Sequence, residues 1–315
     1  MLQRISIPTL ALAVVVLVGC GGPFVRVSQR VDLAEPWEDY ERLVIQTRNG
    51  YVELLSGGTE EIRISGVKRA GGATIGEARE NLAQLAIVSG PDEVDPATFV
   101  IAVELPDGLH RKSVGVSLDV RVPERCAAEI KTGNGHVRAE GLKDHAVLRT
   151  NNGSIRVEDV QGRVEAVTHN GRVRAENITG DLEVETGNGR IVADEIAGDC
   201  HLTSSNGRVQ VRRADGSVQV MTSNGSIYVE ATPPPDGQVV LETSNGSIRA
   251  VLPSTLRGQL SLLAGNGGID ADLDKAITLS RPRWSTHAFE AELNGGGDGR
   301  IQLRTSNGSV ALSCR

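Results

Sequence analysis

Hydrophobic residues recur along the second half of the chain with a period of 18 residues. Each period contains the dipeptide Asn-Gly, which begins at residues 134, 152, 170, 188, 206 and 224. Counted from the Asn, small aliphatic residues stand at positions +3, +5, +8, +12 and +14; after Asn170 they are Val173, Ala175, Ile178, Leu182 and Val184. A spacing of two puts both members of a pair on one face of a β-strand, whereas helices need about 3.6. The pattern predicts two short strands in each period, with a bend near +8.

Two kinds of turn are expected to join these strands. Asn-Gly supplies the first, because both residues tolerate a positive φ. A second glycine recurs at +10 in several repeats and supplies the other turn. The predicted turn residues of the first kind are Asn134, Gly135, Asn152, Gly153, Asn170, Gly171, Asn188, Gly189, Asn206, Gly207, Asn224 and Gly225.

Identical residue types at a fixed period indicate that successive repeats stack directly on one another. Stacked repeats form columns of like side chains about 4.8 Å apart, and asparagine amides can hydrogen-bond along such a column. A meander of antiparallel hairpins also accommodates Asn-Gly turns and is the competing arrangement. A meander does not require the same residue type every 18 positions. The sequence therefore predicts an all-β fold, a single-stranded parallel β-helix with coils of about 18 residues.

The flanking segments depart from the repeat. Strand patterns are expected at 42–55, 99–103 and 116–122, with a short helix at 77–88. This part would cap the open end of the stack. A triple-proline loop at 233–235 and an insertion at 273–300 interrupt the later repeats. The predicted domains are a signal peptide at 1–19, a lipid-anchored Cys and linker at 20–40, a capping segment at 41–130 and repeats at 131–315.

The first twenty residues are typical of a secretory leader. Arg4 precedes an apolar run at 5–18, which is short for a membrane span. The run ends in Leu17-Val18-Gly19-Cys20, which resembles the lipobox of bacterial lipoproteins. The resemblance implies that Cys20 carries lipid and anchors the mature, extracytoplasmic chain in the membrane. By the same resemblance, Gly21 in place of Asp favours the outer membrane if the envelope is Gram-negative. A plain signal peptide with an incidental Cys is the alternative.

Composition and charge narrow the function classes. Aromatic residues are 3% of the chain and 37 of 315 residues are Gly, which indicates a turn-rich structure with a core of small aliphatics. A hydrophobic fraction of 39% excludes wholesale disorder. The chain has 33 Lys and Arg against 40 Asp and Glu, a net charge of −7. This balance argues against nucleic acid as a partner.

The residues before and within the repeats resemble a known family. The run from Val116 to Gly135, VSLDVRVPERCAAEIKTGNG, leads into repeated copies of T-x-N-G-x-[IV]-x-[VA]. Over residues 40–315 the chain resembles the putative-adhesin family of bacterial β-strand-repeat surface proteins. The resemblance implies a right-handed parallel β-helix at the cell envelope. That family has no agreed catalytic residues, so none is transferred.

Charged residues form columns at outward positions of the predicted strands. Basic residues recur at +2 and +4, beside an acidic column at +6. The acidic column offsets the repulsion within the basic ones, so a solvated, charge-balanced face is the simplest interpretation. The functional hypothesis is a groove for anionic glycans or lipid headgroups, because arginine offers paired donors to such anions. The candidate ligand-facing residues are Arg138, Arg156, Arg172, Arg174, Arg190 and Arg208.

The sequence shows no cluster typical of catalysis or metal binding. Asp181 and Asp199 share one phase of the repeat, but two carboxylates are too few ligands for calcium without help. Four histidines occupy four different phases and show no zinc spacing: His136, His145, His169 and His201. We therefore expect no catalytic residue, no metal and no cofactor.

Three cysteines follow the leader. Cys200 occupies an apolar phase of the repeat and is expected in the core. Cys126 and Cys314 bracket the repeats, which places them too far apart along a stack for an intramolecular disulfide unless the termini fold back.

These patterns predict a non-catalytic lipoprotein of the cell envelope that acts as an adhesin-like or scaffold surface. The expected partners are the membrane, through the lipid, and a glycan, a lipid headgroup or an envelope protein. Two alternatives stay open: a glycan-active β-helix enzyme, and an envelope-stress sensor or regulatory partner protein. Turnover assays on polysaccharides distinguish the first alternative, and crosslinking to a partner distinguishes the second.

Overall fold

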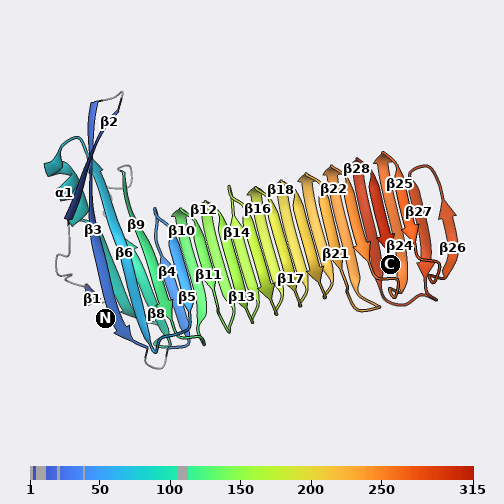
Figure 1. Ribbon diagram of the computed structural model, residues 1–315, viewed down its shortest axis with the longest axis horizontal. Coiled ribbons are helices and arrows are strands. Elements are labelled where there is room, and N and C mark those ends of the chain that lie inside the picture. Colours follow the sequence, from blue (N-terminus) through green and yellow to red (C-terminus); the bar gives the residue numbers. More distant parts are fainter. Residues whose placement is uncertain (1–2, 5–11, 20–21, 38–39, 106–112) are drawn as a thin grey trace. The chain divides into compact units, whose positions relative to one another are not determined.

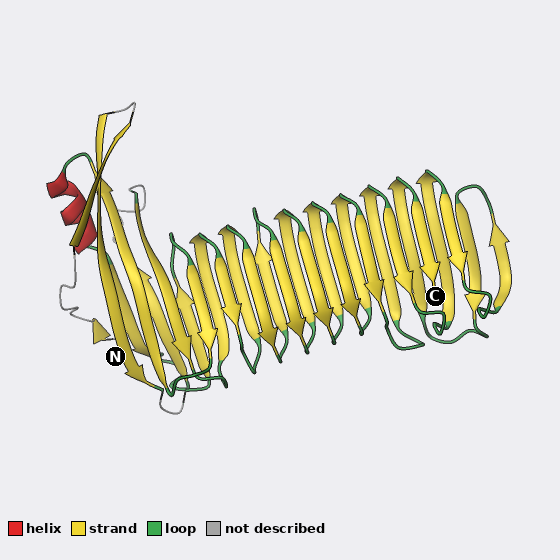
Figure 2. Ribbon diagram, viewed as in Figure 1, coloured by secondary structure: helices red, strands yellow, loops and turns green. Residues whose placement is uncertain are grey.

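The computed structural model describes residues 3–4, 12–19, 22–37, 40–105 and 113–315. These residues are mostly β-strand, with one short α-helix (Figure 2). The chain divides into two compact units, Met1–Ser154 and Ile155–Arg315, which are described separately. Among the described residues, no helix has both the length and the apolar character needed to cross a membrane.

The strands of the first unit lie in two sheets (Figure 1). Its elements are β1 Gln3–Arg4, β2 Leu12–Gly19, β3 Gly22–Pro36, β4 Arg42–Gln46, β5 Val52–Ser56, β6 Glu61–Gly72, α1 Ile75–Ala83, β7 Ala86–Pro91, β8 Thr98–Glu104, β9 Val114–Val122, β10 Ala127–Asn134, β11 Val137–Glu140 and β12 Ala146–Asn152. One sheet has the order β1-β7-β8-β4-β10-β12 and the other β2-β3-β6-β9-β5-β11. The β8-β4-β10-β12 and β9-β5-β11 neighbours are parallel, and the other pairs are antiparallel.

The strand–turn–strand segment expected at 42–55 forms β4 and β5, between strands from later in the chain. β4 pairs with β8 on one side and with β10 on the other, and β5 pairs in the same way with β9 and β11. The Asn134 side chain donates to the Asn49 side-chain oxygen at 2.7 Å. The early Asn-Gly motif is therefore a neighbour of the first regular repeat, 85 residues further along the chain.

The predicted helix at 77–88 exists but begins and ends earlier, at Ile75 and Ala83. Thr74 caps it by accepting the Glu77 N–H at 3.1 Å. Ile87 and Val88 belong instead to β7, which pairs with β8. Both are β-branched residues, which are favoured in strands over helices. The helix packs on β3 and β6.

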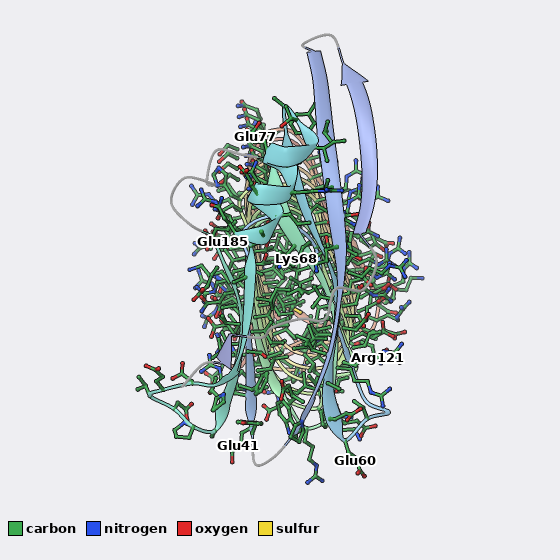
Figure 3. The ribbon with its side chains drawn as sticks, turned by 90° about the vertical axis from the view of Figure 1, so that its left-hand side faces the viewer. Glu41, Glu60, Lys68, Glu77, Arg121 and Glu185 are labelled. Carbon is green, nitrogen blue, oxygen red and sulfur yellow. The ribbon has the colours of Figure 1, made fainter. Side chains whose placement is uncertain are left out.

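The β6 strand carries a partly desolvated lysine. Burial lowers the pKa of Lys68, which is labelled below α1 and Glu77 in Figure 3.

The strands of the second unit alternate between two sheets, which we call sheet A and sheet B. Sheet A has the order β14-β16-β18-β20-β22-β28-β24-β27-β26 and sheet B the order β13-β15-β17-β19-β21-β23-β29-β25. Their bounds are β13 Ile155–Val160, β14 Val164–Thr168, β15 Val173–Ile178, β16 Leu182–Asn188, β17 Ile191–Ile196, β18 Cys200–Asn206, β19 Val209–Ala214, β20 Val218–Asn224, β21 Ile227–Ala231, β22 Gln238–Asn245, β23 Ile248–Leu252, β24 Gly258–Asn266, β25 Ile269–Leu273, β26 Leu279–Trp284, β27 Ala288–Leu293, β28 Arg300–Asn307 and β29 Val310–Cys314.

Strands one repeat apart pair in parallel and in register. In sheet B, Val173 pairs with Ile191 and Ala175 with Ala193; in sheet A, Leu182 pairs with Cys200. We call a sheet A strand and the sheet B strand that follows its Asn-Gly corner a rung. The predicted columns of like residues are confirmed, and an antiparallel meander is wrong for the repeats of this unit. The five aliphatics that follow Asn170 are at most 1% exposed, as the pattern predicted for a core position.

Asparagine and threonine columns stabilise the first corner of each rung. The Asn188 amide donates to the Asn170 side-chain oxygen at 2.8 Å, and Asn206 donates to Asn188 at 2.9 Å. The Thr186 hydroxyl donates to the Gly171 carbonyl at 3.1 Å. Both sets of bonds join adjacent rungs, so each polar side chain at the corner is satisfied by the repeat beside it.

The reason for glycine at the first corner differs from the prediction. None of the six predicted corner glycines has φ in the left-handed range. A Cβ atom on Gly189 or Gly207 would instead lie 1.9 Å from the carbonyl oxygen of the preceding rung's corner glycine. The glycines at +10 are crowded in the same way, since a Cβ on Gly198 would lie 2.5 Å from the Gly180 carbonyl oxygen. Close approach of the backbones, not positive φ, excludes side chains at both corners.

Left-handed backbone occurs instead at position +7, where sheet B strands bend toward the second corner. Asp159, Asn177, Glu195 and Arg213 have φ between 48° and 59°. Each is left unpaired between its strand and the next, opposite the equivalent residue, so the register from β13 to β19 is unbroken and the column is a row of left-handed kinks. The register shifts between β19 and β21, beside Arg213, as in a β-bulge. Asp and Asn adopt this conformation more readily than Glu or Arg, so the kinks at Glu195 and Arg213 carry more backbone strain.

The last rung lies out of sequence order. β28 pairs with β22 on one side and β24 on the other, and β29 pairs with β23 and β25. The chain therefore leaves one rung position open after β23, builds β24 and β25 beyond it, and returns to fill the position with residues 300–314. The insertion expected at 273–300 contains β26 and β27, an antiparallel hairpin that extends sheet A past β24.

Candidate functional site

The outward face of sheet B carries the predicted columns of charge. Arg156 pairs with Arg174 and Glu158 with Glu176 in the strand register, so like charges lie on adjacent strands. Strand alternation projects these residues outward, because their neighbours Val157 and Ala175 are buried. The face is therefore a product of the same repeat that builds the core.

Three of the six candidate arginines form ion pairs along their own strands. Arg156 contacts Glu158 at 2.6 Å and Glu176 on the next strand at 3.8 Å, and Arg174 hydrogen-bonds Glu176. The bond to Glu176 raises the pKa of the Arg174 guanidinium. In the first unit, Arg138 contacts Glu140 at 2.7 Å. The acidic column thus neutralises the +4 arginines, as the charge-balanced interpretation expected.

The other three candidates follow the Asn-Gly corner directly and are exposed. Arg208 donates to the Ser226 hydroxyl at 3.1 Å. Within residues 113–315, no ion pair involves the side chain of Arg172 or Arg190. The backbone of each is bonded to the preceding strand of sheet B, since Ile155 N–H donates to the Arg172 carbonyl at 2.9 Å and Val173 N–H donates to the Arg190 carbonyl at 3.0 Å. Two guanidinium groups on adjacent rungs are thus available to an anionic group.

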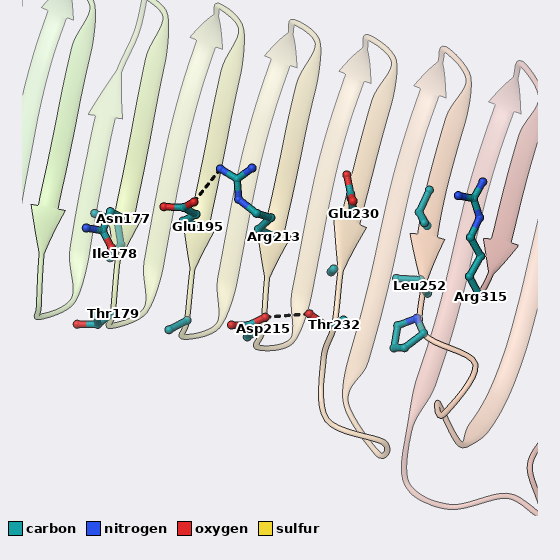
Figure 4. Close-up of a pocket in the computed structure, with 14 residues that line it drawn as sticks. Asn177, Ile178, Thr179, Glu195, Arg213, Asp215, Glu230, Thr232, Leu252 and Arg315 are labelled. Atoms are coloured by element: carbon teal, nitrogen blue, oxygen red, sulfur yellow. Dashed lines mark hydrogen bonds and ion pairs between the residues drawn. The ribbon is translucent and has the colours of Figure 1, made fainter.

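A groove follows the second corner across six neighbouring strands of sheet B, from β15 to β29 (Figure 4). Its volume is about 650 Å³, and six strands span roughly 24 Å at about 4.8 Å per strand. Buried aliphatic residues such as Ile178 and Leu252 contribute to the lining, and Glu195, Asp215 and Glu230 supply carboxylates. The repeat pattern does not reveal this groove, because its lining residues at +7, Asn177, Glu195 and Arg213, share no residue type.

Most polar groups of the groove are already paired. Arg213 contacts Asp194 at 2.7 Å and Glu195 at 3.0 Å. The Thr232 hydroxyl donates to Asp215 at 2.8 Å, as Figure 4 shows. The groove has the length and direction for a linear ligand that crosses the strands. The charged side chains that line it are three acidic residues and two arginines, so the groove is not basic.

Asp181 and Asp199 have a structural role at the second corner. The Asp181 side chain accepts the Asp199 N–H at 3.0 Å, and Asp199 accepts the Ser217 N–H at 2.8 Å. They therefore cap the backbone of the adjacent rung instead of facing each other across a ligand. Among the described residues, no group of three or more His, Cys, Asp or Glu side chains is arranged to hold a metal ion.

The three described cysteines are free thiols in the interior. Burial raises the pKa of Cys126 and Cys200 to about 12 and that of Cys314 to about 11. Thiols in this state are neither nucleophiles nor metal ligands at neutral pH. Cys20, the predicted lipidation site, lies outside the described residues.

Comparisons with known proteins assign no family to this chain. No family model matches it, and no curated protein matches it. Among solved structures it is similar to a "putative cell adhesion protein from Clostridium sporogenes ATCC 15579", at 10% sequence identity and a TM-score of 0.22. That match covers 91% of this chain and 100% of the other. A TM-score of this size supports no statement about fold or function.

Proposed function

We propose that the protein is a non-catalytic lipoprotein of the bacterial envelope, in which a right-handed parallel β-helix presents a repeated, adhesin-like or scaffold surface. The in-register parallel sheets support a helical path with two strands per coil. The apolar leader that ends at Cys20 supports a lipid anchor. The net charge of −7 argues against nucleic acid as the partner.

The observation that carries the binding proposal is the pair of exposed guanidinium groups of Arg172 and Arg190. They occupy equivalent positions on adjacent rungs, about 4.8 Å apart, beside arginines that are already neutralised. A planar guanidinium binds carboxylate, sulfate or phosphate through two parallel hydrogen bonds. A linear anionic chain can contact successive rungs, and many weak contacts along one chain add up to useful avidity. The proposed ligand is an anionic glycan.

Affinity chromatography on polygalacturonate and heparin, with dextran as the neutral matrix, tests this proposal. The protein should be retained on the anionic matrices and not on dextran, and Arg172→Glu/Arg190→Glu should elute at lower salt. Arg283→Glu/Arg304→Glu changes the net charge equally on sheet A strands and should elute like the wild type. Equal retention of both variants would contradict the assignment to sheet B.

Vesicles distinguish a glycan from a lipid headgroup. Sedimentation with phosphatidylglycerol vesicles, compared with phosphatidylcholine vesicles, should show no dependence on Arg172 or Arg190. Loss of phosphatidylglycerol binding in Arg172→Glu/Arg190→Glu, together with unchanged glycan retention, would assign the arginines to lipid.

The anchor has its own test. Cys20→Ala should move the protein from the membrane fraction to the soluble fraction of the cell envelope, because the acyl chains have no other attachment point in this proposal. A Cys200→Ala variant controls for the loss of a thiol and should stay membrane-bound. Membrane association of Cys20→Ala equal to that of the wild type would contradict lipidation.

A glycan-active enzyme is the second candidate, favoured by the groove carboxylates Glu195, Asp215 and Glu230. Hydrolysis needs a pair of carboxyl groups on the two sides of the scissile bond. Glu195 is tied to Arg213 and Asp215 to Thr232, which favours a binding role. Release of reducing ends from polysaccharides that is abolished by Glu230→Gln would replace the non-catalytic proposal.

A further inference from the structure

In sheet B, backbone N–H groups of each strand donate hydrogen bonds to carbonyl groups of the strand in the following rung. The N–H groups of Ile191, Val209 and Ile227, whose side chains face the core, donate to carbonyls of the following rung at 3.0–3.1 Å. Val310 N–H continues this row and donates to the Gly268 carbonyl at 3.0 Å. The row thus runs through β29 to β25, where sheet B ends.

β25 has no further strand to receive its donors. It pairs with β29 only, among the described residues. By the alternation of the ladder, the N–H and C=O groups of Ile269, Ala271 and Leu273 point away from β29, toward the open edge. The side chains of these three residues are only half-buried, whereas equivalent residues such as Val310 and Leu312 are buried. Both the backbone and the core side chains of this strand therefore lack a neighbour.

The matching edge of sheet A is protected against pairing. Its last strand, β26, contains Pro282, a register shift between Ser280 and Arg283, and Arg281 with φ of 49°. Proline, bulges and charge are the features by which natural proteins stop strand addition. β25 has a regular register over its whole length and contains no proline. The contrast indicates that the edge of sheet B is left open for pairing.

Charge defines what the edge accepts. Asp270 and Asp272 project outward from β25 and are exposed. Two copies of β25 paired with each other would place aspartates side by side, which is unfavourable. A strand with basic residues at its outward positions would instead form cross-strand ion pairs with them. The same strand needs apolar residues at the alternate positions, to cover Ile269, Ala271 and Leu273.

We propose that the free edge of β25 is the docking site for an extended segment of a partner protein, in which apolar and basic residues alternate and which adds to sheet B as one further strand. Main-chain hydrogen bonds supply affinity in this mode of recognition, and the alternate side chains supply specificity. The site uses none of the arginines in the glycan proposal, so the two proposals can fail independently.

The probe is a short fluorescein-labelled peptide in which valine and arginine alternate, titrated into the full-length protein and followed by anisotropy. We expect saturable binding, and weaker binding of a peptide with the same composition in scrambled order. Asp270→Lys/Asp272→Lys should lower the affinity at least tenfold and should gain affinity for a peptide in which valine and glutamate alternate. Asp215→Lys/Glu230→Lys, an equal charge change in the groove, should bind like the wild type.

Two measurements place the peptide on the edge. Ala271→Pro removes a donor that faces the open side and leaves the pairing with β29 intact, so it should lower the peptide affinity at least tenfold with little change in melting temperature. In hydrogen exchange, the amides of Ile269, Ala271 and Leu273 should become protected when the peptide binds. Absent binding, equal binding by the Lys variants or protection elsewhere would overturn the proposal. Self-association of the protein through β25 would replace the partner by a second copy.

Discussion

At the scale of single residues, the repeat is selected by contacts between adjacent rungs. Corner glycines are required because the preceding backbone occupies the place of a Cβ atom. Asparagine is required because its amide can donate to one neighbour and accept from the other, as Asn188 does between Asn170 and Asn206. Each such residue serves two repeats at once, so substitutions at the corners should disturb more than one rung.

Gly189→Ala tests the steric account of the corner. A Cβ atom there would lie 1.9 Å from the Gly171 carbonyl oxygen, so the backbones must separate. We expect a loss of about 2–3 kcal/mol in the free energy of unfolding, in the range of overpacked cores. Gly268→Ala is the matched control, since its Cβ would have no atom within 4 Å. Urea denaturation measures both; equal midpoints for the two variants would contradict close approach as the cause.

The buried thiols predict a loss of stability at alkaline pH. The pKa of Cys200 is about 12 in the folded protein against an ordinary value of 9.0. Above pH 9 the unfolded chain loses this proton and the folded chain keeps it, so ionisation favours unfolding until the pH reaches the folded pKa. Each such thiol costs about 1.4 kcal/mol per pH unit in this window.

Cys200→Val removes this contribution and retains an apolar core residue. Between pH 8.5 and pH 10.5, the free energy of unfolding from urea titrations should fall by about 2 kcal/mol less in the variant than in the wild type. The full stability is expected below pH 9 in both proteins. An identical fall in both would show that the Cys200 thiol ionises as easily in the folded protein as in the unfolded chain.

At the scale of elements, the spacing of two predicts the strands of the repeats, whereas the local sequence does not predict where the helix ends. The pairs that follow Asn170 lie in β15 and β16 as expected. The sequence pattern predicts a helix that ends too late, because Leu85 and Ala86 continue its apolar spacing. In the structure, residues from Ala86 onward belong to β7, which pairs with β8. Tertiary pairing decided that boundary, and the pairing partner is not visible in the local pattern.

The repeat pattern does not predict the row of left-handed kinks at +7, because its residues have no common type. Asn177→Val should lower the free energy of unfolding by about 1–2 kcal/mol, since a β-branched residue resists the left-handed conformation at φ of 54°. Asn177→Gly also loses the bond from Asn177 to Asp159 but accepts this φ, so it separates the two effects. Thermal and urea unfolding should rank Val below Gly; the reverse order would contradict a strained left-handed backbone at residue 177.

At the scale of the whole molecule, the stacking of repeats was predictable but their order was not. A period defines which residues share a column and does not define which rung is next. The sequence contains one signal of this order: residues 222–226, 243–247 and 305–309 are all Thr-Ser-Asn-Gly-Ser, and these three segments lie on consecutive strands of sheet A and their corners. The period also predicts the charged columns of sheet B. It does not predict which arginines form ion pairs, which depends on distances, or that β25 ends the sheet, which depends on the strand order.

Distances between spin labels on one column test the stack and its order most directly. In a Cys20→Ser background, we expect labels at Arg172→Cys and Ser309→Cys to be separated by five strand spacings, about 24 Å, and labels at Arg172→Cys and Gly268→Cys by six, about 29 Å. Pulsed electron paramagnetic resonance measures both pairs. A longer distance to Ser309 than to Gly268, or distances that do not follow the strand spacing, would contradict the in-register stack in which the last rung lies between β23 and β25.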